Sequence, residues 1–314
     1  MGDTVRIVEK PDLKNPFLVA AWPGMGNVAL TAVNYLKDKL GAKLLGEMPD
    51  LEYFAPTGAV VANQIVRPPD KPVNQFFYHR SVSANDILFF IGTVQPIPHL
   101  EYGFAREILK FARLFGVTTV ITAGAAPSDM GFQDVPRVFA VPNRQELVKK
   151  LMEYKVHFMS EGNIAGLNGL LISVAIEEGL RGICILGEIP FFTAQIEFPR
   201  AALRVLEVLN PMLGVTVDLT DLNQYVTRKE KEYEPIANLL LQNQQEKEAP
   251  ESEKFMPEPE KEIPKSVRLQ IEQLFKQAEF DGNYKTKMRL KEALDQWGLF
   301  EEYQDRFLDL FRKP

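Results

Sequence analysis

The segment from Gly162 to Leu203 limits the possible folds of this chain more than any other segment. Its glycines and asparagines precede an apolar helical run, which is followed by the short apolar strand Ile183–Leu186 and a second helical run. A strand that is apolar on both faces is typical of the middle of a parallel sheet. The glycines and asparagines tolerate unusual backbone angles. The segment therefore predicts a strand–helix repeat whose loops depend on backbone shape rather than on reactive side chains.

Strand and helix patterns alternate along most of the chain. Apolar runs predict strands, and apolar residues spaced three and four apart predict helices. Between residues 43 and 80, strand patterns follow one another without a long helix, which predicts a locally mixed sheet with a hairpin. Together these patterns predict an α/β fold, a three-layer αβα domain with a mostly parallel, partly mixed sheet. The expected central strands are Phe17–Trp22, Ile87–Ile91, Val117–Thr122 and Ile183–Leu186, and the expected helices are Asn27–Leu40, Glu101–Phe115, Asn143–Glu153, Leu167–Glu178 and Arg200–Leu213.

The pattern changes near the C-terminus. Residues 1–241 carry the α/β pattern, whereas residues 242–265 consist largely of Glu, Lys, Pro and Gln. A segment of that composition buries too little apolar surface to offset its ordering entropy, so we expect a disordered linker. Residues 266–314 carry three short amphipathic stripes and predict a small three-helix, all-α unit.

Charge and cysteine content narrow the function classes. A net charge of -6 argues against general nucleic-acid binding, which needs clustered Lys and Arg. Cys184 is the only cysteine, so no intrachain disulfide is expected, and its place in an apolar strand predicts a buried side chain. The N-terminus lacks the pattern of a signal peptide, and no apolar run reaches the ~18 residues of a membrane span. We expect a cytoplasmic protein without a membrane partner.

A glycine turn follows the first long strand. Trp22–Ala29 fits the G-x-G-x-x-A pattern, with Glu47 near the end of the next strand, which is the outline of a dinucleotide fingerprint. Three interpretations stay open: a tight packing turn, an anion site at the helix N-terminus, or an NAD site. No motif of metal ligands or of a nucleophile with its base is present, so the sequence predicts no metal, no cofactor and no catalytic residue.

Several loops follow strands of the expected parallel sheet and should meet at its carboxyl edge. Such a cleft, rich in backbone amides, would suit a carboxylate, a phosphate or a nucleoside. Glu188 is either part of that ligand site or a buried structural carboxylate. The candidate cleft residues are Gly24, Gly26, Asn27, Thr93, Gln95, Gly124, Asn163, Asn168, Gly187 and Glu188.

Four large apolar residues lie close together after the Ile183–Leu186 strand. Phe191, Phe192, Ile196 and Phe198 are either an interface of a closed homo-oligomer or a cap on the core.

Four segments in this order resemble the PAC2 family of proteasome assembly chaperone-like proteins. They are FLVAAWPGMGNVALTAVNYL (Phe17–Leu36), ILFFIGTVQP (Ile87–Pro96), VTTVITAGAA (Val117–Ala126) and Gly162–Leu203. The resemblance implies a domain similar to nucleoside phosphorylases in layer order, a homo-oligomer, and a chaperone role in assembling the proteasome core particle. Some relatives dock on the α-subunit ring through a C-terminal hydrophobic-Tyr-any tail, which Leu310–Pro314 does not match.

The sequence thus favours an oligomeric protein-binding or assembly chaperone-like function related to the proteasome. The expected partners are further copies of the chain and either proteasome α subunits or a proteasome-related complex. The alternative is an enzyme that binds a small molecule or nucleotide in the glycine-rich cleft. The sequence leans away from the enzyme without excluding it.

Overall fold

The computed structural model describes residues 5–49, 53–54, 58–248, 265–281, 283–297, 299–300, 303, 306–307 and 310. The chain divides into two compact units, Met1–Gln242 and Asn243–Pro314. The first unit is the α/β domain and contains both cavities considered below.

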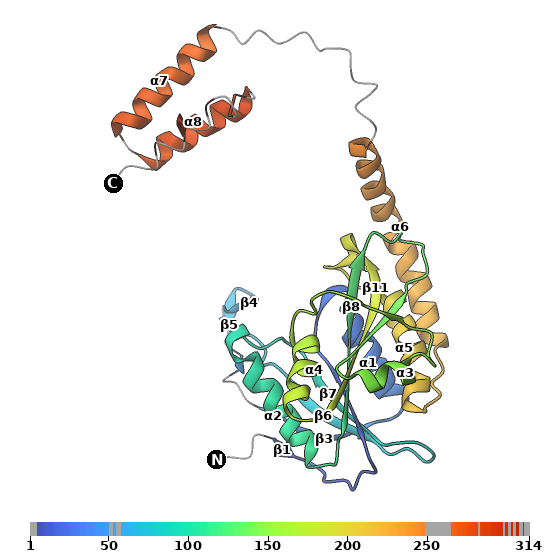
Figure 1. Ribbon diagram of the computed structural model, residues 1–314. Helices are drawn as coiled ribbons and strands as arrows, with labels where there is room; N and C mark the ends of the chain where they lie inside the picture. The colour runs from blue at the N-terminus through green and yellow to red at the C-terminus, as the bar shows by residue number, and fades with distance from the viewer. Residues whose placement is uncertain are drawn as a thin grey trace. The chain divides into compact units, whose positions relative to one another are not determined.

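The described part of the α/β domain is built on a mixed sheet in the order β1-β3-β6-β7-β2-β8-β11-β9-β10 (Figure 1). The middle strands β7, β2, β8 and β11 are mutually parallel, whereas β1, β3 and β6 run antiparallel at one end and β9 runs antiparallel to β11. The strand bounds are β1 Arg6–Ile7, β2 Phe17–Ala21, β3 Lys43–Glu47, β6 Asn74–His79, β7 Ile87–Gly92, β8 Thr119–Ser128, β9 Val138–Pro142, β10 His157–Phe158 and β11 Arg181–Pro190.

Helices cover both faces of this sheet, as Figure 1 shows. One core lies between the sheet and α1, α3, α5 and α6, and the other lies between the sheet and α2 and α4. The predicted three-layer α/β fold is therefore confirmed. The helix bounds are α1 Val28–Lys39, α2 Glu101–Arg113, α3 Gln145–Leu151, α4 Leu167–Glu177, α5 Pro199–Leu213 and α6 Thr220–Glu248.

The burial of the strands follows their apolar patterns. Every residue of β7 is buried, as expected of a strand covered by helices on both faces. In β6, by contrast, buried and half-buried residues alternate. Strand β8 runs on to Ser128, beyond its expected end at Thr122, because it pairs with β11 along its full length.

Strand β9 was not predicted from the sequence. The strand is a short apolar run, VFAVP, of which Val138 and Ala140 are buried. It lies between β11 and β10. This position brings the residue before it, Arg137, next to Glu188 on β11.

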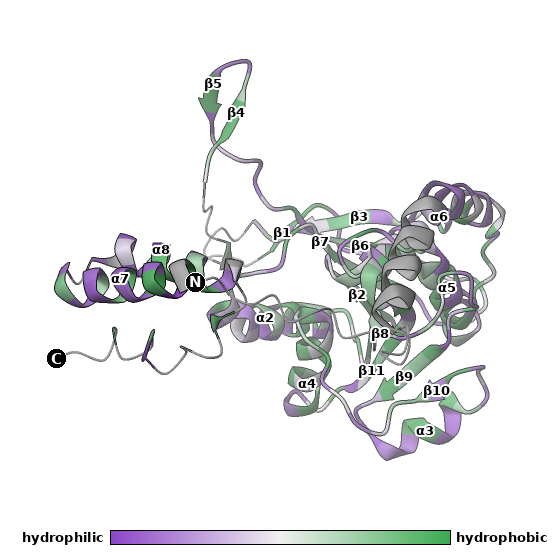
Figure 2. Ribbon diagram, turned by 90° about the horizontal axis from the view of Figure 1, so that it is seen from above, coloured by the Kyte–Doolittle hydropathy of each residue, from purple (hydrophilic) through white to green (hydrophobic). Residues whose placement is uncertain are grey.

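A small hairpin stands apart from the main sheet. Strands β4 (Val60–Ala62) and β5 (Ile65–Arg67) pair only with each other among the described strands. Figure 2 shows the hairpin projecting from the domain, and Val61, Ile65 and Val66 are each about two-thirds exposed.

In the second unit, α7 (Lys265–Asp281) and α8 (Tyr284–Gln296) surround a small core. Asn283 caps α8 by accepting a hydrogen bond from the backbone N–H of Lys285. Phe307, from the third predicted stripe, joins this core, as does Leu299, which was not part of that stripe. Helix α6 continues to Glu248, so the first part of the expected linker is helical, and residues 249–264 lie outside the described residues. No described helix combines the length and apolar character needed to cross a membrane.

Candidate functional site

A cavity of about 280 Å³ opens at the carboxyl ends of the parallel strands. Gly24 follows β2, Gln95 follows β7, and Gly124 lies on β8 just beyond its last pairing with β2, at Thr122. Asn163 and Asn168, from the loop before α4 and from its first turn, complete the set. Five of the predicted cleft residues therefore line one space, because loops that follow parallel strands emerge at the same edge of a sheet.

Gln95 fixes the shape of this cleft. Its side-chain amide nitrogen donates to the backbone carbonyl of Pro23 at 2.7 Å, and its amide oxygen accepts from the backbone N–H of Leu167 at 3.3 Å. One side chain therefore links the loop after β2 to the N-terminus of α4. Both ends of the Gln95 amide are occupied, which makes it a structural element of the cleft wall.

The start of α4 is tightly packed against the preceding loop. Gly166 has a φ of 74°, a conformation that favours glycine. A Cβ on Gly169 would lie 2.2 Å from the carbonyl oxygen of Ile164. Glycine at 169 therefore lets the loop cross directly over the first turn of the helix, which the dense Gly/Asn composition of this segment had suggested.

Asn168 differs from the other polar groups of the cleft. The residue is 5% exposed, and its backbone oxygen accepts a hydrogen bond from Thr122 at 2.6 Å. Its side-chain oxygen Oδ1 is buried without a hydrogen-bond partner among the described residues. Since buried polar atoms are nearly always paired, this oxygen is an open hydrogen-bond acceptor on a residue that lines the cavity.

The cavity wall has little charge. Among its described lining residues there is no Lys, Arg or His, and Glu161 at the exposed rim is the one carboxylate. Beyond Thr122, strand β8 pairs with β11 but not with β2. The cleft thus offers amide side chains and backbone groups, which suits an uncharged hydrogen-bonding ligand better than the phosphate or carboxylate considered from the sequence.

The predicted cleft residues Gly26, Asn27, Thr93 and Gly187 do not line the cavity. Gly26, with φ 62°, donates a hydrogen bond from its backbone N–H to the carbonyl of Ala194, and its own carbonyl accepts one from the backbone N–H of Phe198. These bonds connect the glycine turn to the loop after β11.

Asn27 adopts a left-handed conformation before α1 and makes no capping bond through its side chain. The Thr93 hydroxyl accepts from the backbone N–H of Val73. Gly187 packs against α5, where a Cβ would lie 2.9 Å from the carbonyl of Ala201.

Glu188 lies outside the cleft in an ion pair whose carboxylate is buried and whose Arg137 side chain is 54% exposed. Its carboxylate accepts from the backbone N–H of Arg137 at 3.0 Å, from the Arg137 guanidinium Nε at 2.9 Å, and from the Ser128 hydroxyl at 2.7 Å. Burial by itself would raise the pKa of Glu188, but the hydrogen bonds from Arg137 and Ser128 outweigh it and lower that pKa to about 2. This geometry supports the structural interpretation of Glu188. Sequence reasoning missed Arg137 because β9 itself was missed.

The four apolar residues after β11 do not form one exposed patch. Phe198 is 1% exposed and lies in the core beside Phe132, with ring centroids 5.9 Å apart. Phe192 is half-buried and contacts the same ring. Only Phe191, 60% exposed, is open to a partner, and Ile196 is half-buried. The cap-on-the-core interpretation therefore holds for Phe198.

Reactive side chains are not concentrated in the described structure. Burial raises the pKa of the Cys184 thiol to about 12, so it stays protonated near neutral pH. Within the described part of the chain, no three His, Cys, Asp or Glu residues lie together as metal ligands would.

Known proteins resemble this chain over most of its α/β unit. A protein of Methanocaldococcus jannaschii, the uncharacterized protein MJ1210, is 26% identical over 235 residues, which cover 74% of this chain and 87% of that protein. The crystal structure of Pyrococcus furiosus PbaB, an archaeal proteasome activator, matches with a TM-score of 0.65 and 26% identity, over 74% of this chain and 98% of that one. Pyrococcus furiosus PbaA, an archaeal homologue of proteasome-assembly chaperone, matches with a TM-score of 0.58 and 27% identity, over 76% and 99%.

The family model for PAC2 matches residues 18–237, which include the glycine turn, the central parallel strands, the cleft and most of α6. The chain belongs to the PAC2 family.

Proposed function

We propose that this protein binds the proteasome or its unassembled subunits and acts as an assembly chaperone or as an activator. The observation that carries this proposal is the similarity to PbaB and PbaA, at 26% and 27% identity over nearly the full length of those chains. One relative is described as a proteasome activator and the other as a homologue of an assembly chaperone. The two roles need different partners, the complete core particle and the free subunits respectively.

The two roles can be separated with purified components. The full chain is mixed with unassembled proteasome α subunits and, separately, with the assembled core particle, and complexes are detected by native mass spectrometry. A chaperone binds the free subunits and speeds assembly of the core particle. An activator binds the assembled particle and raises peptide hydrolysis. Failure to bind either species would refute the proposal.

We also propose that the chain forms a homo-oligomer in the cytoplasm, with the exposed ring of Phe191 in the contact between copies. Exposed aromatic rings are enriched at protein interfaces. Light scattering compares the wild type with Phe191→Asp, and the matched control is Val82→Asp, which changes an apolar residue that is fully exposed. We expect the measured particle mass to fall for Phe191→Asp and to stay unchanged for Val82→Asp. A monomeric wild type would refute the oligomer.

A second candidate function is the binding of a small uncharged ligand in the carboxyl-edge cleft. The unpartnered Oδ1 of Asn168 favours it, because an amide or a nucleobase carries the complementary donors and acceptors. A thermal-shift screen can compare nucleosides with their monophosphates, and Asn168→Ala should abolish any shift. Stronger stabilisation by the monophosphates would contradict the uncharged class.

A further inference from the structure

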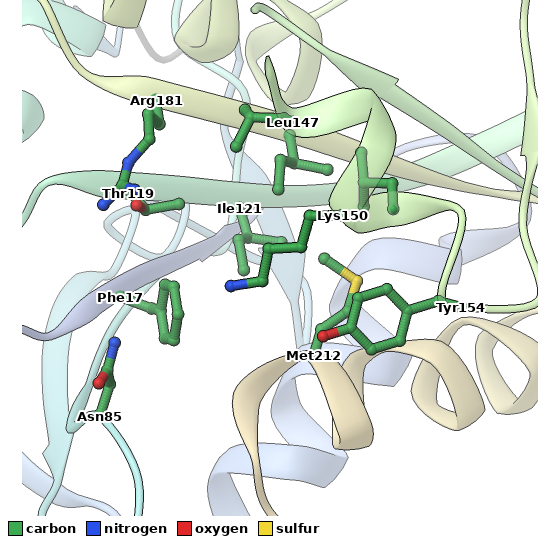
Figure 3. Close-up of a pocket in the computed structure, with 11 residues that line it drawn as sticks. Phe17, Asn85, Thr119, Ile121, Leu147, Lys150, Tyr154, Arg181 and Met212 are labelled. Atoms are coloured by element: carbon green, nitrogen blue, oxygen red, sulfur yellow. The ribbon is translucent and has the colours of Figure 1, made fainter. Parts of the chain in front are cut away.

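A second cavity, of about 170 Å³, lies at the opposite edge of the sheet (Figure 3). Thr119 and Arg181 are the first residues of β8 and β11, and Phe17 is the first residue of β2. The pocket therefore lies at the amino ends of the same parallel strands whose carboxyl ends form the cleft. Helix α3 closes one side, and Met212, near the end of α5, closes another.

The floor of this pocket is apolar and well packed. Ile121 from β8 is 1% exposed, and Ile183 from β11 is 6% exposed. Leu147 and Leu151 of α3 are also buried, and Phe17 lines the same pocket. A ligand that enters the pocket would therefore place an apolar group on this floor.

Two basic residues, Lys150 and Arg181, line the pocket together with its apolar floor. Figure 3 shows Lys150 reaching inward from α3, while Arg181 approaches from the start of β11 beside Thr119. Arg181 donates one N–H to the hydroxyl of Thr118 at 3.0 Å, which leaves other guanidinium donors for a ligand. Lys150 forms no ion pair within the described part of the chain, and no Asp or Glu is among the residues lining the pocket.

Neutral donors and acceptors complete the rim. Asn85 lies below Phe17, and the hydroxyl of Tyr154 points toward Met212 (Figure 3). Burial and the nearby Glu153 raise the pKa of Tyr154, so its hydroxyl keeps its proton near neutral pH. The rim therefore combines two positive charges with neutral hydrogen-bonding groups.

We propose that this pocket binds a small apolar carboxylate, with the carboxylate between Lys150 and Arg181 and the apolar group on the floor formed by Ile121, Ile183 and Leu147. The planar guanidinium matches the geometry of a carboxylate. The volume corresponds to about six waters at their liquid volume of about 30 Å³ each, which suits a short branched or aromatic acid. Inorganic phosphate would satisfy the cations but leave the floor without a contact.

The same chemistry has two sources: a free organic acid and the carboxyl-terminal residue of a polypeptide. This inference goes beyond the proposed proteasome-related function and does not depend on it. Its test uses the full chain and four probes, namely benzoate, isovalerate, benzamide and a short peptide ending in leucine. Isothermal titration gives the affinities, and amidation of the peptide removes its terminal carboxylate.

We expect benzoate and isovalerate to bind and benzamide to bind at least about fivefold more weakly, because the amide lacks the charge. Lys150→Ala should weaken benzoate binding by about fivefold, whereas Lys149→Ala, which removes an exposed neighbour that does not line the pocket, should leave it unchanged. Binding should also weaken at high ionic strength, because the cations are exposed. Methyl NMR shifts at Ile183 and Leu147 would locate the acid on the floor.

Three results would overturn the proposal. Equal binding of benzoate and benzamide, or equal effects of Lys150→Ala and Lys149→Ala, would remove the role of the cations. Competition by inorganic phosphate as strong as that by isovalerate would remove the role of the apolar floor. If the leucine peptide binds and its amidated form does not, the polypeptide source is supported, and binding of the free acids alone supports the small-molecule source.

Discussion

The two edges of the parallel sheet differ in whether a basic side chain is paired with an acidic one. At the carboxyl edge, Arg137 is held by the buried carboxylate of Glu188, whose side chain is 3% exposed. At the amino edge, Lys150 stands over an apolar pocket that no acidic side chain lines. Arg137 therefore forms an ion pair within the fold, whereas Lys150 has no acidic partner among the residues that line its pocket.

Two asparagines, Asn143 and Asn168, differ in the same way, in whether their side chains have hydrogen-bond partners within the chain. Asn143 accepts from the backbone N–H of Gly182 at 2.8 Å and donates to the carbonyl of Leu180 at 3.1 Å. Asn168 keeps a buried amide oxygen without a partner among the described residues. A polar side chain whose bonds are all made within the chain stabilises the fold, whereas one with an open bond is a candidate for binding. The following predictions test this difference.

The largest effect is expected from Arg137→Ala. Removing the guanidinium leaves the Glu188 carboxylate buried without its main partner, which should lower the free energy of unfolding by about 3–5 kcal/mol. Urea titration of a Trp297→Phe background reports this loss through Trp22, which is buried in the α/β unit. A loss no greater than that of Lys150→Ala would contradict the proposed difference between the two edges.

The next effect is on the pH dependence of stability. The pKa of Glu188 is about 2 in the folded chain, below its ordinary value of 4.5, so its contribution is present above pH 4.5 and is lost as the pH falls toward 2. The loss amounts to about 3 kcal/mol for 2.5 pKa units. Urea midpoints measured from pH 6 to pH 2.5 should fall more steeply in the wild type than in Glu188→Gln. Parallel curves would show that the ion pair does not govern acid stability.

The alanine variants of the two asparagines should differ in unfolding free energy by a smaller amount. Asn143→Ala leaves the backbone N–H of Gly182 without its acceptor and should cost about 2 kcal/mol. Asn168→Ala removes an amide whose oxygen has no described partner, so we expect a loss below about 1 kcal/mol. The same urea titration compares the two variants. A larger loss for Asn168→Ala would show that this amide has a structural role.

The smallest effect on stability is expected at the amino edge. Lys150 is exposed and forms no described ion pair, so Lys150→Ala should change the free energy of unfolding by less than about 0.5 kcal/mol. Lys149→Ala is the matched control on the same helix. A clear loss of stability in Lys150→Ala alone would assign this lysine to the fold rather than to a ligand.

Local sequence pattern predicted much of the fold. The continuous apolar runs identified β7 and β11 as central strands, and the spacing of apolar residues located α1, α2, α4 and α5. The helix predicted over Asn27–Leu40 corresponds to α1, and Gly41, with a φ of 59°, follows its C-cap residue Leu40. The convergence of Gly24, Gly124 and Asn168 on one cavity was also predictable, because parallel strands place their following loops at one edge.

The remaining features depend on contacts between distant segments. Strand β9 is a short apolar run whose place in the sheet no local pattern gives, and its antiparallel pairing with β11 puts Arg137 beside Glu188 across a separation of 51 residues. Phe191 and Phe198 have the same side chain, yet packing against Phe132 buries the second and leaves the first exposed.

The sequence by itself determined the α/β class, the central strands and the glycine-rich loops, because periodicity and backbone freedom are local properties of the chain. Only the tertiary structure decided which polar groups are satisfied. Whether Asn168 or Lys150 has a partner depends on strand register and helix packing, which bring together residues that no local pattern connects.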